Sequence, residues 1–169
     1  MSLRFHEDDA RALGRGTAGV MGIRPGESDF VVGLALVTQG STLLVASENG
    51  IGKRTTFEDY RKQSRGGKGI ITMKVTDKTG PVVGTVTVTE EDELMLMTSS
   101  GQSIRIRASE VRETGRNAQG VKLLTLKPGE KLQDISRVIP DGEDADGALA
   151  SAGEDEEPDT PNSEDEPAG

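Results

Sequence analysis

Residues 61–73 read RKQSRGGKGIITM, and the same skeleton of arginine, glycine and apolar residues occurs twice more in the chain. In this copy Arg65 is followed four residues later by Gly69, and an apolar residue comes directly after that glycine. The matching arginines, Arg15 and Arg116, lie 50 residues before and 51 residues after Arg65. A period near 50 residues is typical of repeat architectures, in which each unit packs against its neighbours.

Short apolar runs closed by turn residues fill each repeat. Thr42–Ala46 ends at Asn49-Gly50, and Leu94–Met97 ends at Ser100-Gly101, as the strands of β-hairpins do. Val82–Val88 alternates small or polar residues with β-branched ones, which is typical of a half-buried strand. No helical period is sustained for more than about two turns. The sequence therefore predicts an all-β fold with four strands per repeat, arranged as propeller-like blades.

About two and a half repeats are present, and we place them at residues 4–52, 53–103 and 104–140. The first repeat starts late, because it lacks the hairpin expected ahead of Arg4. The third contains a strand-length apolar run at Val121–Leu126. Since propellers usually have at least four blades, we expect either a fragment of a longer protein or an open arc with unpaired strand edges.

Composition excludes several kinds of functional site. The chain has no cysteine and a single histidine, His6, so thiolate metal sites, histidine clusters and a Ser-His-Asp triad are not expected. Neither a P-loop nor a nucleophile with a matching base is present. No apolar run approaches the roughly 20 residues that cross a bilayer, and no signal peptide follows Met1. We predict a cytoplasmic, non-catalytic chain that holds no metal or cofactor.

Charge divides the chain into two parts. Residues 141–169 carry 12 acidic side chains and no basic ones, so the net charge of −9 leaves residues 1–140 at +3. The acidic segment is rich in Pro, Gly, Ser and Ala and contains too little apolar surface to fold, so we predict a disordered tail. Two roles remain open for this tail, which are solubility and competition with a polyanion for the basic body.

A basic cluster lies between residues 53 and 74, where seven basic side chains accompany two acidic ones. Such a cluster is typical of phosphate binding. Gly66-Gly67 lets backbone N–H groups approach a phosphate, Arg65 can bind it bidentately, and Lys68 adds a point charge. Aromatic residues make up only 2% of the chain, so a duplex is favoured over a single strand, and binding should tolerate any sequence. The predicted DNA-binding residues are Lys53, Arg54, Arg61, Lys62, Gln63, Arg65, Gly66, Gly67, Lys68, Gly69, Lys74, Arg15, Arg105 and Arg116.

Structural roles compete with this interpretation. Each repeated arginine has an acid six residues before it, so the pairs can simply hold blade turns. The repeated glycines favour turns or close packing over a phosphate cradle. Tyr60 occupies an apolar position of the repeat, which favours packing over catalysis. The pairs are Arg15 with Asp9, Arg65 with Asp59 and Arg116 with Glu110, and the glycines are Gly19, Gly69 and Gly120.

One motif resembles a known family. Residues 63–69, QSRGGKG, closely resemble the gyrase A box, whose usual form is Q, a basic residue and RGGKG. Residues 4–139 as a whole, including RFHEDD, GRGTAGVMGI and ETGRNAQGVKLL, resemble the distal blades of the C-terminal domain of the DNA gyrase A subunit. The sequence departs from the family pattern in two respects. Ser64 stands where the family has a basic residue, and the box lies in a late blade rather than the first.

The resemblance implies an open fragment of a six-bladed β-pinwheel that wraps double-stranded DNA and supports ATP-dependent negative supercoiling. The partners that it implies are the rest of the gyrase A subunit together with the gyrase B subunit. It also implies ATP and magnesium bound elsewhere in the enzyme, and a place at the bacterial nucleoid. Two alternatives stay open. One is the related domain of topoisomerase IV, which lacks a recognisable box, and the other is a free-standing propeller-like module for protein interactions.

Overall fold

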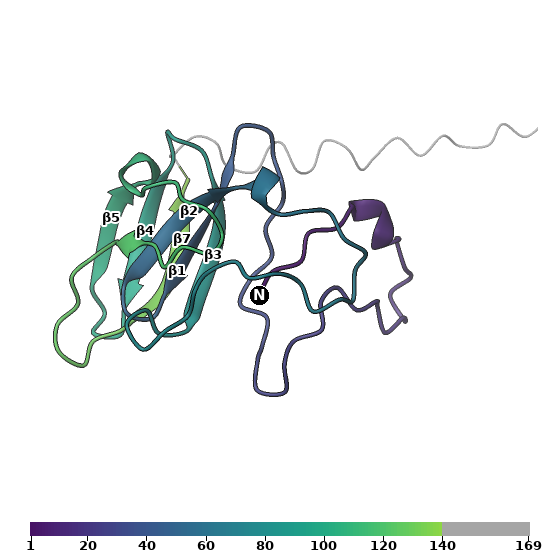
Figure 1. Ribbon diagram of the computed structural model, residues 1–169, viewed down its shortest axis with the longest axis horizontal. Coiled ribbons are helices and arrows are strands. Elements are labelled where there is room, and N and C mark those ends of the chain that lie inside the picture. The colour runs from purple at the N-terminus through teal and green to yellow at the C-terminus, as the bar shows by residue number, and fades with distance from the viewer. Residues whose placement is uncertain (140–169) are drawn as a thin grey trace, which may run out of the picture. The chain divides into compact units, whose positions relative to one another are not determined.

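Antiparallel β-strands make up almost all the regular structure of residues 1–139, which are the residues that the computed structural model describes (Figure 1). The predicted all-β fold is therefore confirmed. Helical geometry in these residues is confined to three 3₁₀ turns of three residues each. The elements are η1 (Glu7–Asp9), β1 (Thr42–Ser47), β2 (Ile51–Thr56), η2 (Phe57–Asp59), β3 (Val82–Val88), β4 (Glu93–Thr98), β5 (Ser103–Arg107), η3 (Ala108–Glu110), β6 (Val121–Lys122) and β7 (Leu132–Val138).

The first sheet has four strands in the order β3-β1-β2-β6. Strands β1 and β2 form the predicted hairpin, whose turn closes with a hydrogen bond of 2.9 Å from Gly50 N–H to Ser47 O. Leu44 of β1 lies opposite Arg54 of β2 on one side and Val86 of β3 on the other. The outer edge of β2 pairs with β6, which belongs to the third repeat, through Ile51 and Lys122. Each blade is thus built from more than one repeat.

The second sheet repeats the plan with three strands, β5-β4-β7, among the described residues. Its hairpin β4–β5 corresponds to β1–β2, and its strand β7 corresponds to β3. We call β3 and β7, each of which pairs with the first strand of a hairpin, the inner strands. The pairing of β1 with β3 shifts register between Ala46 and Ser47. The pairing of β4 with β7 shifts at the matching place in the repeat, between Met97 and Thr98. The predicted strand at Val121–Leu126 is shorter than expected, because only Val121–Lys122 pairs.

Aliphatic side chains of the two sheets form the larger core cluster, which includes Leu44, Val88, Leu96 and Ile135. Strands β3 and β7 approach closely at Gly84, where an added Cβ would lie 2.9 Å from Cγ1 of Ile135. A smaller cluster includes Tyr60, which is buried and shares a 2.7 Å hydrogen bond with Thr72 Oγ1. The prediction that Tyr60 is a packing residue is confirmed.

Residues 1–40 contain no named strand, although the repeat aligns residues 31–33 with the start of β3. Isolated bridges connect Ser2, Arg4 and Ile23 to residues 62–70. The acidic tail predicted for residues 141–169 lies outside the described residues. None of the helices found in residues 1–139 is long and apolar enough to span a membrane.

Candidate nucleic-acid interface

The loop that carries the basic motif, residues 61–70, is attached at both ends to the first residues of the chain. Gln63 N–H donates to Arg4 O at 2.8 Å, and Ile70 N–H donates to Ser2 O at 2.7 Å. Ser2 N–H returns a 2.8 Å bond to Ile70 O. The corresponding loop of the next repeat is attached to β2 in the same way, with Thr114 N–H donating to Arg54 O at 2.8 Å. The same backbone hydrogen bonds therefore recur between successive repeats and hold this loop. We call this set of contacts the joint.

The centre of the loop is also held by backbone hydrogen bonds. Gly66 N–H donates to Gly22 O at 2.6 Å, and Arg24 N–H donates to Gly67 O at 2.8 Å. Gly66 has a φ of 76°, in the left-handed region that favours glycine. Because its N–H already has a partner within the fold, Gly66 is not a phosphate donor in this conformation.

The repeated arginines bind backbone carbonyls. Arg65 donates from Nε to Asp9 O at 2.7 Å and from Nη1 to Met21 O at 3.3 Å. Arg116 makes the equivalent contact from Nη1 to Ile71 O at 2.9 Å. No ion pair in residues 1–139 joins these arginines to the acids that the repeat places six residues earlier. The repeated arginines therefore have a structural role, which consists of hydrogen bonds to backbone carbonyls. Nη2 of Arg65 takes no part in these bonds and is left to bind a ligand.

Two of the repeated glycines, Gly69 and Gly120, are close-packing positions, as the sequence predicted, and all three have a positive φ. Gly19, Gly69 and Gly120 have φ values of 77°, 77° and 96°. A Cβ on Gly69 would overlap the carbonyl oxygen of Ser2, and a Cβ on Gly120 would overlap that of Gly52. These two glycines permit the close approach of successive repeats at the joint.

Two predicted DNA-binding residues, Lys53 and Arg54, lie inside the fold instead of on its surface. The Lys53 ammonium donates to Gly115 O at 2.7 Å and also to Arg116 O. Burial, with a smaller contribution from the nearby Arg116 charge, lowers the Lys53 pKa from 10.5 to about 8. Arg54 donates from Nε to Val111 O at 2.7 Å and pairs with Glu90 at 2.8 Å. We therefore leave both residues out of the surface proposed below.

The remaining basic residues of the cluster are exposed, namely Arg61, Lys62, Arg65, Lys68 and Lys74. All five come from residues 61–74, which form no named strand, and four of them lie in the loop of residues 61–70. Arg15 is also exposed, but it belongs to the first copy of the loop. Arg105 lies on β5 of the second sheet and is paired with Glu93, which partly neutralises it.

Gln63 is half-buried, and its side-chain amide nitrogen makes no hydrogen bond among the described residues. The residue that matches it in the next repeat, Thr114, also has a buried side-chain oxygen without a partner among those residues. Because this feature recurs where the loop lacks the QSRGGKG motif, it belongs to the joint and is not evidence of DNA contact.

The three copies of the loop differ most in charge. Lys62 and Lys68 of the middle copy match Ala12 and Ala18 of the first copy, and they match Glu113 and Gln119 of the third. By contrast, the arginine and the glycine that form the joint are present in all three copies. The two exposed lysines are thus the charges that set the middle loop apart.

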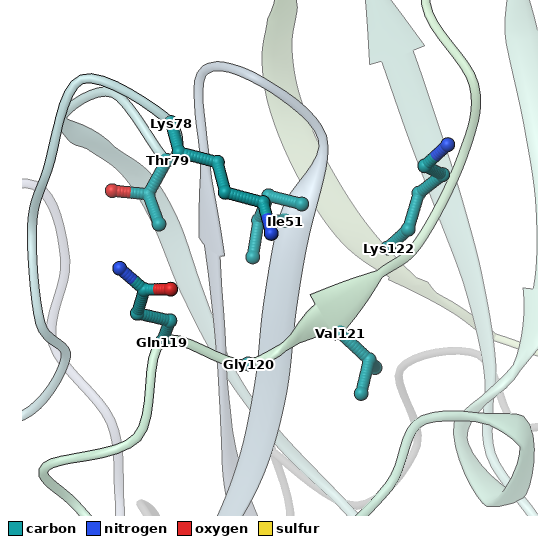
Figure 2. Close-up of a pocket in the computed structure, with 7 residues that line it drawn as sticks. All are labelled: Ile51, Lys78, Thr79, Gln119, Gly120, Val121 and Lys122. Atoms are coloured by element: carbon teal, nitrogen blue, oxygen red, sulfur yellow. The ribbon is translucent and has the colours of Figure 1, made fainter.

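A cavity of about 320 Å³ opens beside the third copy of the loop (Figure 2). Figure 2 shows Lys78 extending toward Ile51 and the Gln119 amide lying below Thr79, while Lys122 points away. The sequence patterns did not predict this cavity, because its walls come from different repeats. No group of three or more His, Asp or Glu residues in residues 1–139 is placed to hold a metal ion.

A family profile described as DNA gyrase C-terminal domain, beta-propeller, matches residues 1–38, 41–89 and 92–139. The second and third matched segments each begin with a hairpin and end with an inner strand. The predicted repeats have the same period but a different starting point.

Similar sequences occur in longer proteins. The DNA gyrase A subunit of Helicobacter pylori strain J99 is 52% identical over 126 residues, which cover 73% of this chain and 15% of that protein. The DNA gyrase A subunit of Escherichia coli K12 is 43% identical over 154 residues, covering 90% of this chain and 18% of that protein. The chain therefore spans less than a fifth of the length of these curated relatives.

Two solved structures share the fold. A DNA gyrase A C-terminal domain superposes with a TM-score of 0.73 at 34% identity, covering 80% of this chain and 46% of that chain. The C-terminal domain of a DNA topoisomerase IV also superposes with a TM-score of 0.73, at 21% identity, covering 79% of this chain and 42% of that chain.

Proposed function

Because this chain belongs to the DNA gyrase C-terminal domain family, we propose that it binds and wraps duplex DNA as a non-catalytic part of the gyrase A subunit. The observation that carries this proposal is the loop of residues 61–70, which the fold holds at both ends and which presents exposed lysines that the other two copies lack. A fixed loop loses little conformational entropy when it binds a phosphate backbone.

Within this loop, Lys62 and Lys68 are the proposed principal contacts. Their ammonium groups attract phosphates without reading bases, which suits DNA that is wrapped irrespective of sequence. Arg61, Lys74 and the Nη2 atom of Arg65 extend the same surface. Gly67 lets the loop approach a phosphate closely, whereas Gly66, Gly69 and most of Arg65 serve the joint.

The wider setting is part of the same proposal. The chain would act with the remainder of the gyrase A subunit. The gyrase B subunit, a further partner, would hydrolyse the ATP that drives negative supercoiling, and ATP and magnesium would be bound elsewhere in the complete enzyme. The enzyme would act in the bacterial cytoplasm, at the nucleoid. The motif RGGKG at residues 65–69 favours gyrase over topoisomerase IV. The likeness to the topoisomerase IV domain concerns the fold alone.

Binding of the full chain to linear duplex DNA over a range of salt concentrations tests this proposal. Each phosphate contact contributes a slope of about −0.9 in log K against log salt, so the five basic groups named above give roughly −4.5. Wrapping should also bring the DNA ends closer, which fluorescence transfer between end labels measures. An affinity that does not change with salt, or binding without bending, would contradict the proposal.

The acidic tail, residues 141–169, is proposed to compete with DNA for the same basic loop. A tethered competitor acts at an effective concentration that can reach the millimolar range. A version of the chain that ends at Pro140 should therefore bind DNA more tightly at low salt. The gain should shrink toward 1 M salt, where the Debye length falls to about 3 Å. Equal affinities of the two versions at low salt would reduce the tail to a solubility element.

A further inference from the structure

In each copy of the loop, the second residue after the repeated glycine has an exposed side chain. In the first copy this residue is Met21, which is 54% exposed, and in the second copy it is Ile71, which is 49% exposed. In the third copy it is Lys122, which is also exposed and points away from the neighbouring cavity in Figure 2. We call these three residues the outward residues. Their position lies on the surface whether it holds an apolar or a basic side chain.

Neighbouring segments are in place around the outward residues, so their exposure belongs to the position itself. Lys122 of β6 pairs with Ile51 of β2 and is nevertheless exposed. Arg116, from the third copy of the loop, donates to Ile71 O at 2.9 Å, yet about half of the Ile71 side chain remains exposed. The following loop thus binds the backbone of the outward residue and leaves its side chain at the surface.

Met21 lies against the basic loop of residues 61–70. Arg65 Nη1 donates to Met21 O at 3.3 Å, and Gly66 N–H donates to the carbonyl of the next residue, Gly22, at 2.6 Å. These bonds fix the backbone that carries the Met21 side chain. Nη2 belongs to the same guanidinium group as Nη1, so a phosphate bound at Nη2 would lie next to Met21.

The chemistry of a DNA backbone indicates what such a side chain would contact. Each phosphate is attached to deoxyribose rings, whose C–H groups line the edges of the minor groove and are apolar. Several proteins that bend DNA place apolar side chains in this groove. A phosphate group alone offers no apolar surface, so it gives an exposed methionine or isoleucine no favourable contact. The unbranched, polarisable side chain of methionine adapts well to such an irregular surface.

We infer that Met21 and Ile71 contact deoxyribose along the minor groove of the bound duplex, one at each of two successive loops. Lys122, at the same position of the third copy, contacts a phosphate. This inference rests on the proposed function, because it concerns the way in which the same surface holds DNA. The apolar contacts add affinity without releasing counterions, so salt does not weaken them as it weakens the lysine contacts. They also read no bases, so they suit binding that tolerates any sequence.

The double variant Met21→Ser with Ile71→Ser tests the inference in the full chain, because it removes both apolar side chains and no charge. Its affinity for linear duplex DNA should fall by about tenfold at a fixed salt concentration, since the apolar burial is lost. The slope of log K against log salt should stay the same, because every phosphate contact remains. Affinity for linear polyphosphate, which contains phosphates but no deoxyribose, should not change.

Two further double variants serve as controls. Leu34→Ser with Ile139→Ser removes apolar side chains that are 84% and 57% exposed outside the three loops, and it should bind DNA as tightly as the unmodified chain. Met21→Leu with Ile71→Leu keeps the apolar surface and should also retain the affinity. Thermal unfolding verifies that each variant is folded.

The outcomes separate this inference from the proposed function. If the double serine variant binds DNA as tightly as the unmodified chain, the inference is overturned and the proposed function stands. Equal losses of affinity for DNA and for polyphosphate would also overturn the inference, because the basic loop itself would then be disturbed. If the unmodified chain does not bind duplex DNA, the proposed function fails and the inference fails with it.

Discussion

Gly120→Ala is expected to lower the free energy of unfolding by about 3 kcal/mol, of which roughly 1 kcal/mol is the left-handed backbone and the rest is steric overlap. Gly120 has a φ of 96°, and its added Cβ would overlap the carbonyl oxygen of Gly52. Gly52 pairs with Val121 at this point, so the two backbones can separate only by disrupting β2–β6 pairing. Urea denaturation of both proteins measures the difference.

Gly101→Ala is the matched control for this prediction. Gly101 has a φ of 80°, but a Cβ there would meet nothing within 4 Å. Its replacement should therefore cost only the left-handed backbone, about 1 kcal/mol. If both substitutions destabilise the chain equally, the close approach of successive repeats contributes nothing to the Gly120 effect.

Exchanging Lys62→Glu and Lys68→Gln is expected to weaken DNA binding by about tenfold or more at low salt, since two phosphate contacts are lost. These are the residues that the third copy of the loop has at Glu113 and Gln119. The slope of log K against log salt should become less steep by about 1.8. Both lysines are exposed, and neither ammonium group is ion-paired in residues 1–139, so the melting temperature should hardly change.

Lys127→Glu with Arg107→Gln makes the same change in net charge outside the loop. Both control residues are exposed, and neither side chain forms an ion pair within the described part of the chain. Lys131 is less suitable as a control because its ammonium bonds Asn49 Oδ1 at 2.6 Å. Similar losses of affinity in the two double variants would mean that binding depends on net charge and not on the loop.

The hairpins and the repeat period were predictable because both can be read from the order of residues alone, without knowing which segments pack together. Asn49-Gly50 and Ser100-Gly101 mark turns by their own backbone preferences, and alternation over a few residues marks a strand. The all-β fold follows from these short-range patterns. They also predicted correctly that Gly69 and Gly120 are turn or close-packing positions, since few other residues adopt a positive φ.

Burial of individual side chains was not predictable in this way. Lys53 is one of seven basic residues in a cluster, yet its ammonium lies beneath the next loop and bonds the carbonyl of Gly115. Leu3 is the matching residue of the first repeat, so the same position accepts a lysine or a leucine. Charge patterns count side chains along the chain, whereas burial depends on which segments lie across from them.

The sequence alone was sufficient for the period, the hairpins, the separation of a basic body from an acidic tail, and the resemblance on which family membership was first suggested. The tertiary structure decided that Arg65 binds backbone carbonyls and that Lys53 and Arg54 are internal. The physical reason is that each of these features depends on contacts between residues that lie in different repeats. Such contacts form only when successive repeats pack together, and no local pattern of residues specifies their geometry.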